Sequence, residues 1–277
     1  MKIQAITPRQ IEHFYATLIE SGGKRGQGLS GKTVRNTHVV LRKALADAER
    51  LDVVARNASG AANSPTAERP ENPTWSSDQM REFLDYLKDD RLRGAFVVLA
   101  TTGMRRGEVL GLRWSDIDFD SAELSVRNSI TTAGPGNVVA GPPKTPRSRR
   151  QIYLDDATVR ELREQRRKQN EERLAVGPLW DAGEGYVFTD EIGRRVHPDK
   201  FSELFRKRMV EAGLPKIRLH DLRHSYATLA LKAGVHPKVV SERLGHATVG
   251  ITLDTYSHVT PSIAREAADA VASRILG

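Results

Sequence analysis

Four short motifs in this chain carry arginine, histidine and tyrosine side chains that could act together on a phosphodiester. They are TGMRRGE at residues 102–108, HDLR at 220–223, LGH at 244–246, and Tyr256. Two arginines can clamp a phosphate with bidentate hydrogen bonds, and two histidines can pass protons or donate hydrogen bonds to its oxygens. A tyrosine hydroxyl can form a covalent intermediate. Each motif alone is weak evidence, but together they predict covalent attack on a phosphodiester that needs no metal.

The composition is that of a basic globular protein with a polyanionic partner. The 277 residues include 43 Lys and Arg against 35 Asp and Glu, a formal charge of +8, and no cysteine. Basic surfaces concentrate phosphates, although charge alone leaves nucleic-acid binding and an ordinary solvated surface equally open. The lack of cysteine excludes disulfides, thiolate zinc sites and cysteine nucleophiles.

Nothing in the sequence suggests a membrane protein. No segment has the apolar length of a membrane span, and residues 1–18 lack the continuous apolar core of a signal peptide. We therefore expect a cytoplasmic protein without a membrane partner.

Two helices are expected near the N-terminus. The first begins at Thr7-Pro8 and ends near residues 21–23. The second follows Ser30, a candidate cap, and has apolar residues on one side, at Val34, Val40, Leu41, Leu45 and Ala48. Its basic residues could lie against a DNA duplex: Lys32, Arg35, Arg42 and Lys43. The competing interpretation is a solvated helix face on a small bundle.

A region rich in Ala, Asn, Ser and Pro, without periodicity, predicts an interdomain linker. It divides the chain into an N-terminal helical DNA-binding domain at residues 1–56, a linker at 57–74 and a larger domain at 75–277. We expect helices at 75–87 and 94–100, and mostly helices beyond 155. Short strands are expected at 117–119, 123–126, 151–154 and 186–188, with turns such as 133–136 between them. The fold class is therefore mainly α with a small antiparallel β-sheet (α+β).

Three stretches of the larger domain resemble the tyrosine recombinases, the integrase family of phages and mobile elements. They are TTGMRRGEVLGLRWSDID, PPKTPRSRRQIYL and HDLRHSYATLALKAGVHPKVVSERLGHATVGITLDTYSHV. The resemblance is strong from residue 74 onward and weaker at 7–57, which is similar to the core-DNA-binding helical domain of the family. It implies a site-specific recombinase that cleaves and rejoins double-stranded DNA through a 3′-phosphotyrosyl intermediate, without metal, ATP or other cofactor.

The resemblance assigns the phosphate clamp to Arg105 and Arg223. The family pattern Thr-Gly-x-Arg selects Arg105 over Arg106, and Arg223 lies three residues after His220, on the same side of one helix. Both arginines would stabilise the extra charge of a pentacoordinate transition state. The alternative for each is a structural ion pair. Glu108 is expected either to orient the Arg105 guanidinium or to form a surface ion pair.

Two histidines and a lysine are assigned to proton transfer and hydrogen bonding. His220 would act as a general base or donor, and His246 as a second donor in the same pocket. By resemblance, Lys144 would protonate the leaving 5′ hydroxyl. Its alternative role is to anchor a phosphate beside three arginines of the same loop, Arg147, Arg149 and Arg150. The first two of these arginines are candidate DNA-binding residues.

Tyr256, ten residues after His246, is the expected nucleophile. An ordinary tyrosine has a pKa of about 10, so it must lose its proton during attack or be stabilised by nearby cations. Attack would leave a phosphotyrosyl bond and a free 5′ hydroxyl, and the 5′ hydroxyl of a partner strand could then reseal the backbone.

The expected partner is double-stranded DNA at attachment or crossover sites. A terminal amphipathic helix from Pro261 either covers its own core or docks on a neighbouring subunit, and the resemblance favours a homotetramer on DNA. An accessory DNA-bending or directionality factor is a further candidate partner. Integrases usually carry an arm-type segment before the part that matches here, so we do not expect arm-site binding and interpret the N-terminus as naturally short or truncated.

Other functions stay open at this point. A type IB topoisomerase uses the same covalent chemistry but would relax supercoils as a monomer. A non-catalytic helical DNA-binding regulator could use the same basic helices without forming a covalent adduct. A metal-dependent nuclease is disfavoured because acidic residues do not cluster with the histidines in the sequence.

Overall fold

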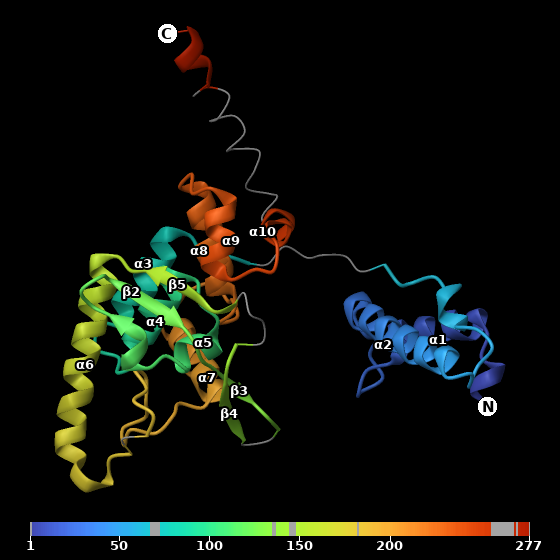
Figure 1. The fold of residues 1–277 in the computed structure, drawn as a ribbon, viewed down its shortest axis with the longest axis horizontal. Coiled ribbons are helices and arrows are strands. Elements are labelled where there is room, and N and C mark those ends of the chain that lie inside the picture. The colour runs from blue at the N-terminus through green and yellow to red at the C-terminus, as the bar shows by residue number, and fades with distance from the viewer. Residues whose placement is uncertain are drawn as a thin grey trace. The chain divides into compact units, whose positions relative to one another are not determined.

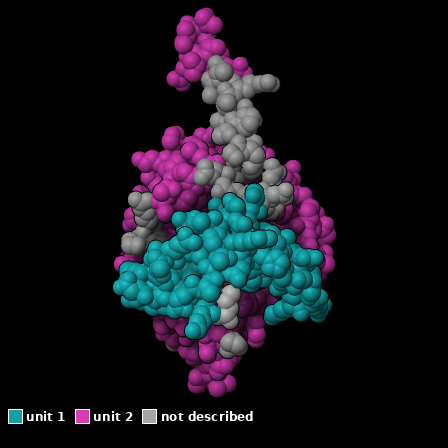
Figure 2. All heavy atoms as spheres, turned by 90° about the vertical axis from the view of Figure 1, so that its right-hand side faces the viewer, with its two compact units in different colours: residues 1–71 teal, residues 72–277 magenta. Residues whose placement is uncertain are grey.

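The computed structural model describes residues 2–66, 73–134, 137–143, 148–181, 183–255, 269 and 271–276. Three predicted site residues, Lys144, Arg147 and Tyr256, lie outside the described residues, as does the start of the predicted terminal helix at Pro261. The chain forms two compact units, residues 1–71 and 72–277, which Figure 2 shows in different colours. We refer to them as unit 1 and unit 2.

Unit 1 is a pair of capped helices on a small apolar core. Helix α1 spans Pro8–Ser21 and begins with a capping box between Thr7 and Gln10. Helix α2 spans Gly31–Arg50, and the Ser30 hydroxyl caps its first turn. Both predicted N-terminal helices are therefore present, with the caps that the sequence indicates.

The core side of α2 differs from the expected apolar stripe at one position. Val34, His38 and Leu45 are buried, and the Tyr15 hydroxyl forms a 2.9 Å hydrogen bond with the His38 Nδ1. Val40, expected on this side, is 70% exposed because it lies about 240° around the helix from Val34. Histidine takes its place in the core, where the tyrosine satisfies the polar ring.

The first part of the predicted linker packs on unit 1. The 3-10 turn Ala58–Gly60 contributes to the core, and the Asn57 side chain donates a 3.0 Å hydrogen bond to the Arg42 carbonyl. Asn63 donates to the Glu12 carboxylate from its backbone and its side chain, at 2.8 and 2.7 Å. A linker that begins at residue 57 is thus placed too early, because small residues that suggest a flexible segment here allow close packing.

Unit 2 is mainly helical, as Figure 1 shows. Its described helices include α3 (Ser77–Tyr86), α4 (Arg93–Thr102), α5 (Arg106–Leu110), α6 (Asp156–Val176), α7 (Pro198–Glu211), α8 (Asp221–Lys232), α9 (Pro237–Leu244) and α10 (Val249–Thr255). One antiparallel sheet has the order β1-β2-β5, with β1 at Ile117–Asp118, β2 at Glu123–Val126 and β5 at Arg150–Tyr153. A separate antiparallel hairpin joins β3 (Ser129–Thr132) to β4 (Val138–Gly141). The predicted fold class is confirmed.

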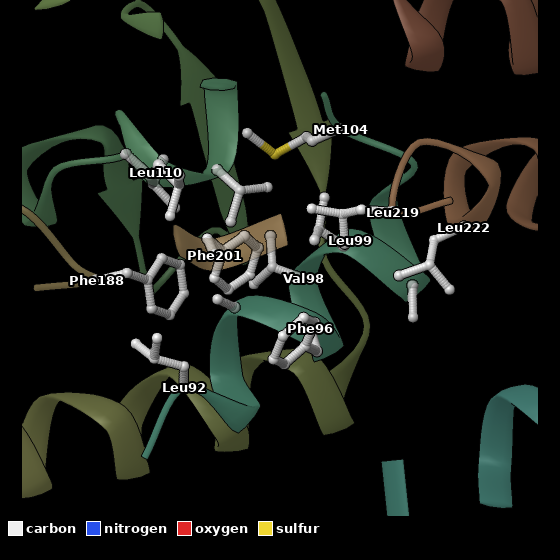
Figure 3. Packing of buried hydrophobic residues seen from close by; sticks show 14 of the residues in the cluster. Leu92, Phe96, Val98, Leu99, Met104, Leu110, Phe188, Phe201, Leu219 and Leu222 are labelled. Carbon is white, nitrogen blue, oxygen red and sulfur yellow. The ribbon is translucent and has the colours of Figure 1, made fainter. Parts of the chain in front are cut away.

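The core of unit 2 surrounds α4. Eight of the ten residues of α4 are buried, which is typical of a helix packed on all sides. Phe96 of α4 stacks on Phe201 of α7 with ring centroids 4.7 Å apart, and Figure 3 shows the two rings among the other core side chains. Because α4 also contacts α5, α6 and α8, the core holds the residues that follow its C-terminal end.

One predicted strand is absent from the structure, and one hairpin is present that the sequence does not predict. Residues 186–188 are buried but contain only an isolated bridge from Tyr186 to Arg113, so the predicted strand is absent. Their apolar character reflects burial in the core and not sheet pairing. The β3–β4 hairpin flanks the predicted turn at 133–136. Its strands have few buried residues and no clear alternating pattern, so the sequence does not reveal them.

Candidate active site

A left-handed glycine turns the chain from α4 into the first arginine motif. Gly103 has φ +66°, and a Cβ there would lie 2.5 Å from the Tyr226 ring and 2.6 Å from Leu244. Only glycine fits this turn without strain. Arg105 follows as the N-cap residue of α5, and the Arg223 Nη1 donates to the Gly103 carbonyl at 2.8 Å. The turn therefore links the two predicted catalytic arginines.

Glu108 is a buried carboxylate between two arginines. It accepts hydrogen bonds from the Arg105 backbone N–H and Nη1 and from the Arg150 Nη2, each at 2.9 Å. Burial raises the pKa of Glu108, but the hydrogen bond and charge of Arg150, and then those of Arg105, outweigh burial and lower its pKa below the usual value. Because only 2% of its side chain is exposed, Glu108 does not form the surface ion pair considered as the alternative.

Arg150 is expected from the sequence only as part of a basic loop, yet its side chain lies inside the site. Its Nε donates to the Arg243 carbonyl at 2.6 Å, and its Nη1 donates to the Ser148 carbonyl at 3.0 Å. The sequence does contain a signal for this position. Arg150 lies two residues before Ile152, on the same face of β5, and Ile152 is buried. Arg149, on the opposite face, is exposed.

Arg105 reaches the histidine motif at the end of α9. Its Nη2 donates to the Gly245 carbonyl at 3.2 Å, while 39% of its side chain stays exposed. Gly245 has φ +69° and directly precedes His246. The His246 Nδ1 lies 2.8 Å from the Thr252 Oγ1 of α10. Arg105 and His246 are 141 positions apart in the sequence. The fold thus holds the guanidinium and the imidazole on adjoining turns.

The pKa of His246 is set by burial and by charged residues from several elements around its ring. Burial, followed by the positive charges of Arg223, Arg105, His224 and Arg150, lowers the pKa of His246 to about 4. His246 is therefore neutral near pH 7. In this form one ring nitrogen donates a hydrogen bond and the other accepts one.

His220 and Arg223 lie at the start of α8. His220 is the N-cap residue, and Arg223, about one turn later, is only 4% exposed. The His220 ring packs edge-on against His224, with ring centroids 5.1 Å apart. His220 is exposed as a residue, but neighbouring atoms crowd its ring. This desolvation, with the charges of His224 and Arg223, lowers the pKa of His220 to about 4, so it too is neutral near pH 7.

A cleft of about 650 Å³ adjoins His220. Four basic side chains line it, Arg106, Arg206, Lys216 and Arg218. The Arg106 Nη1 donates to the Ser202 Oγ at 2.6 Å, and Arg218 forms a bidentate ion pair with the buried carboxylate of Asp221. Two of the guanidiniums are therefore held in place beside His220, and each is paired with a carboxylate, Arg106 with Asp199 and Arg218 with Asp221.

The described residues bring together four of the six predicted catalytic residues, Arg105, His220, Arg223 and His246. Lys144 and Tyr256 lie outside the described residues. In unit 1, the predicted DNA-binding residues Lys32, Arg35, Arg42 and Lys43 are exposed on α2. Lys43 also pairs with Asp47 at 2.8 Å. In unit 2, Arg149 is exposed immediately before β5.

Within the described part of the chain, no three His, Asp or Glu side chains are grouped so that they could hold a metal ion. No helix in this part combines the length and the apolar character that a membrane span requires.

The chain is similar along most of its length to recombinases and integrases. The family model "Phage integrase family" matches residues 74–262. A tyrosine recombinase XerC-like protein of Caldanaerobacter subterraneus subsp. tengcongensis is 33% identical, over 94% of this chain and 69% of that protein. The ICEBs1 integrase of Bacillus subtilis is 31% identical, over 96% of this chain and 71% of that protein.

Solved structures have the same fold. The Tn1549 transposon integrase in complex with transposon right end DNA matches with a TM-score of 0.80 at 22% identity, over 100% of this chain and 88% of that chain. A lambda integrase dimer bound to a COC′ core site matches with a TM-score of 0.64 at 17% identity, over 92% and 81%. The chain belongs to the phage integrase family, the tyrosine recombinases. It is therefore an enzyme of site-specific DNA recombination that breaks and rejoins DNA strands.

Proposed function

We propose that Arg105 and Arg223 clamp the scissile phosphate of a DNA strand while Tyr256 attacks it. One observation carries this assignment of roles. Arg223 donates to the turn before Arg105, and Arg105 donates to the turn before His246. Two guanidiniums and a neutral imidazole therefore converge, and together they can neutralise the charge that develops on a phosphate in the transition state.

In the first step, the Tyr256 oxygen forms a bond to phosphorus, and the bond from phosphorus to the 5′ oxygen breaks. The phenol proton passes to His220, whose lowered pKa keeps it neutral and able to accept a proton. Lys144 supplies the proton for the leaving 5′ oxygen. The two arginines and His246 donate to the non-bridging oxygens. The products are a 3′-phosphotyrosyl bond and a free 5′ hydroxyl.

In the second step, the 5′ hydroxyl of a partner strand attacks the same phosphorus, and the bond to the tyrosine oxygen breaks. The proton of the attacking hydroxyl passes to Lys144, and His220 returns its proton to the tyrosine oxygen. One ester bond is broken and one is formed at each step, so the reaction balances without ATP. Exchange between two duplexes breaks four strands, and each subunit supplies one tyrosine. This stoichiometry supports a homotetramer on DNA, with an accessory DNA-bending or directionality factor as a further partner.

The basic surfaces of both units supply the proposed contacts to the DNA backbone. In unit 2 they are the cleft beside His220, with Arg106 and Lys216, and the segment that contains Arg147 and Arg149. In unit 1 they are the exposed cations of α2, Lys32, Arg35, Arg42 and Lys43. Such contacts position a duplex without reading its sequence. The matched integrases of mobile elements support integration or excision of DNA as the biological reaction. We place this reaction in the cytoplasm.

Nicked duplexes from a randomised DNA library test the assignment of Tyr256. We expect the wild-type protein to form an adduct that survives denaturation, with a nucleotide on Tyr256 in mass spectra. Tyr256→Phe should form no adduct and bind the selected duplex with unchanged affinity. Tyr153→Phe is a matched control, because this tyrosine of β5 is 66% exposed. An adduct formed by Tyr256→Phe would refute the assignment.

A supercoiled plasmid separates the recombinase from a type IB topoisomerase. With a pair of selected sites, the recombinase should yield exchanged products, and these should disappear when one site is removed. Relaxation of a plasmid without either site would favour the topoisomerase. A protein that binds the duplex and never forms an adduct would be a regulator.

A further inference from the structure

Arg150 is bound entirely within the protein. Its side chain is 7% exposed, against 39% for Arg105. The hydrogen bonds of its guanidinium go to Glu108 and to the carbonyls of Ser148 and Arg243. A buried guanidinium is tolerated only when such partners compensate for its lost hydration. Arg150 is therefore not a substitute for Arg105 at the phosphate. The role of its hydrogen bonds follows from the groups that they connect.

The guanidinium of Arg150 connects three elements of the site. It extends from β5, forms a bidentate pair with Glu108 of α5 at 2.9 and 3.3 Å, and donates to the last turn of α9. The turn that leads to His246 packs directly on it, since a Cβ at Gly245 would lie 3.0 Å from the Arg150 Nη1. One side chain thus contacts both the carboxylate that holds Arg105 and the turn that carries His246.

We propose that Arg150 is a positioning residue that fixes the Glu108 carboxylate against Arg105 and supports the turn before His246. This inference rests on the proposed function, because the positions of Arg105 and His246 matter for catalysis only if these residues act on a phosphate. Glu108 uses both oxygens for both arginines. With Arg150 removed, the buried carboxylate loses its bidentate partner and the fixed orientation that Arg105 requires.

Single-turnover adduct formation on a saturating nicked duplex tests this role. We expect Arg150→Met to slow adduct formation by about 10- to 100-fold. This is the range for residues that orient a functional group without contacting the substrate themselves. DNA affinity should change by less than about twofold, because the buried Arg150 side chain does not contact the duplex. Arg150→Lys should recover only part of the rate, because lysine restores the charge and not the planar fork.

Arg91 provides a matched control in the same unit. It forms a bidentate pair with Glu172 of α6 at 2.6 and 2.8 Å and donates to the backbone carbonyls of Thr189 and Asp190. These bonds resemble those of Arg150 but include no residue of the candidate site. Arg91→Met should lower the melting temperature and leave the adduct rate of the folded protein within about twofold of wild type. An equal loss of rate in both methionine variants would reduce Arg150 to a general stabilising residue.

The pH profile gives a readout that a merely structural role would not move. Arg150 is the first of the two cations that lower the pKa of Glu108. In Arg150→Met the pKa of Glu108 should rise, so the acid limb of the rate profile should move to higher pH. If the acid limb of the Arg150→Met profile stays at the wild-type pH and the rate equals that of wild type, the proposal is overturned.

Two further outcomes are decisive. If Arg150→Met does not fold, Arg150→Lys decides: a folded lysine variant with the wild-type rate contradicts positioning, and a slowed one supports it. If wild-type protein forms no adduct while binding the duplex, the proposed function fails first. The Arg150 inference fails by itself when wild type reacts and the folded Arg150→Met variant reacts equally fast.

Discussion

The two units of this recombinase place their charges in opposite ways. In unit 1, the predicted DNA-binding residues of α2 are exposed, and the buried polar side chains of Tyr15 and His38 share a hydrogen bond. In unit 2, three charged residues of the candidate site or its border are at most 4% exposed, Glu108, Asp221 and Arg223. Each makes hydrogen bonds with an oppositely charged or backbone group.

The difference separates two tasks that both require positive charge. Exposed cations attract DNA over a distance, but salt screens them and their side chains move freely. Buried charges are screened little and are held in one geometry, which is what stabilisation of a transition state demands. We therefore propose that unit 1 holds a duplex and that unit 2 changes a bond in it. Three predictions test this separation.

The largest effect is expected from Arg223 of unit 2. Arg223→Met removes the proposed donor to the phosphate and the bond to the Gly103 carbonyl, so adduct formation should slow by about 100- to 1000-fold. Arg223→Lys should be nearly as slow, because lysine cannot form the bidentate contact. Single-turnover rates and DNA dissociation constants, measured on the same samples, check this. If Arg223→Met mainly weakened DNA binding and left the rate of adduct formation unchanged, the proposed contrast between the two units would be wrong.

A smaller effect, of the opposite kind, is expected from α2 of unit 1. Lys32→Ala/Arg35→Ala should weaken DNA binding by about 10-fold and reduce the slope of log affinity against log salt by about 2, with the rate at saturating DNA unchanged. Arg167→Ala/Lys168→Ala on α6 removes the same charge where both side chains already pair with Glu164, and it should change the slope little. Titrations at several salt concentrations check this. Equal slopes for wild type and the α2 variant would show that these cations do not face DNA.

The smallest effect is expected in the pH dependence of stability. The folded pKa of His246 is about 4, below its ordinary value of 6.5, so the unfolded chain binds the proton first as the pH falls. The stability of unit 2 should therefore be fully present above pH 6.5 and decline toward pH 4. His220 contributes with the same sign. All three tryptophans, at positions 75, 114 and 180, belong to unit 2, so their fluorescence during urea unfolding reports this unit alone. His246→Gln should weaken the decline between pH 6.5 and 5, where carboxylates contribute less; an unchanged decline would contradict the assigned pKa.

Much of the site could be predicted from the sequence because its local parts are encoded at helical spacing. Arg105 and Glu108 are three residues apart and meet on one turn of helix, as do His220 and Arg223 at the start of α8. The same is true of the helix caps at Thr7 and Ser30. In each case the partners are near neighbours in the chain, so residue type and spacing suffice.

Predictions that depended on composition were less successful. Small residues at 57–63 suggested the start of a linker, and an apolar triplet at 186–188 suggested a strand. The first segment packs on unit 1, and the second is buried without strand pairing. Composition indicates whether a segment can be buried, but not which surface covers it.

By itself, the sequence determined the family, the mainly helical fold class and the identity of the charged and titratable groups, since these follow from residue type and short spacing. Only the tertiary structure decided which groups share a pocket. The bond from Arg223 to Gly103 spans 120 residues, that from Arg105 to Gly245 spans 140, and the pair of Arg150 with Glu108 spans 42. Such contacts form because the packed core around α4 brings distant turns together, and no local pattern specifies them.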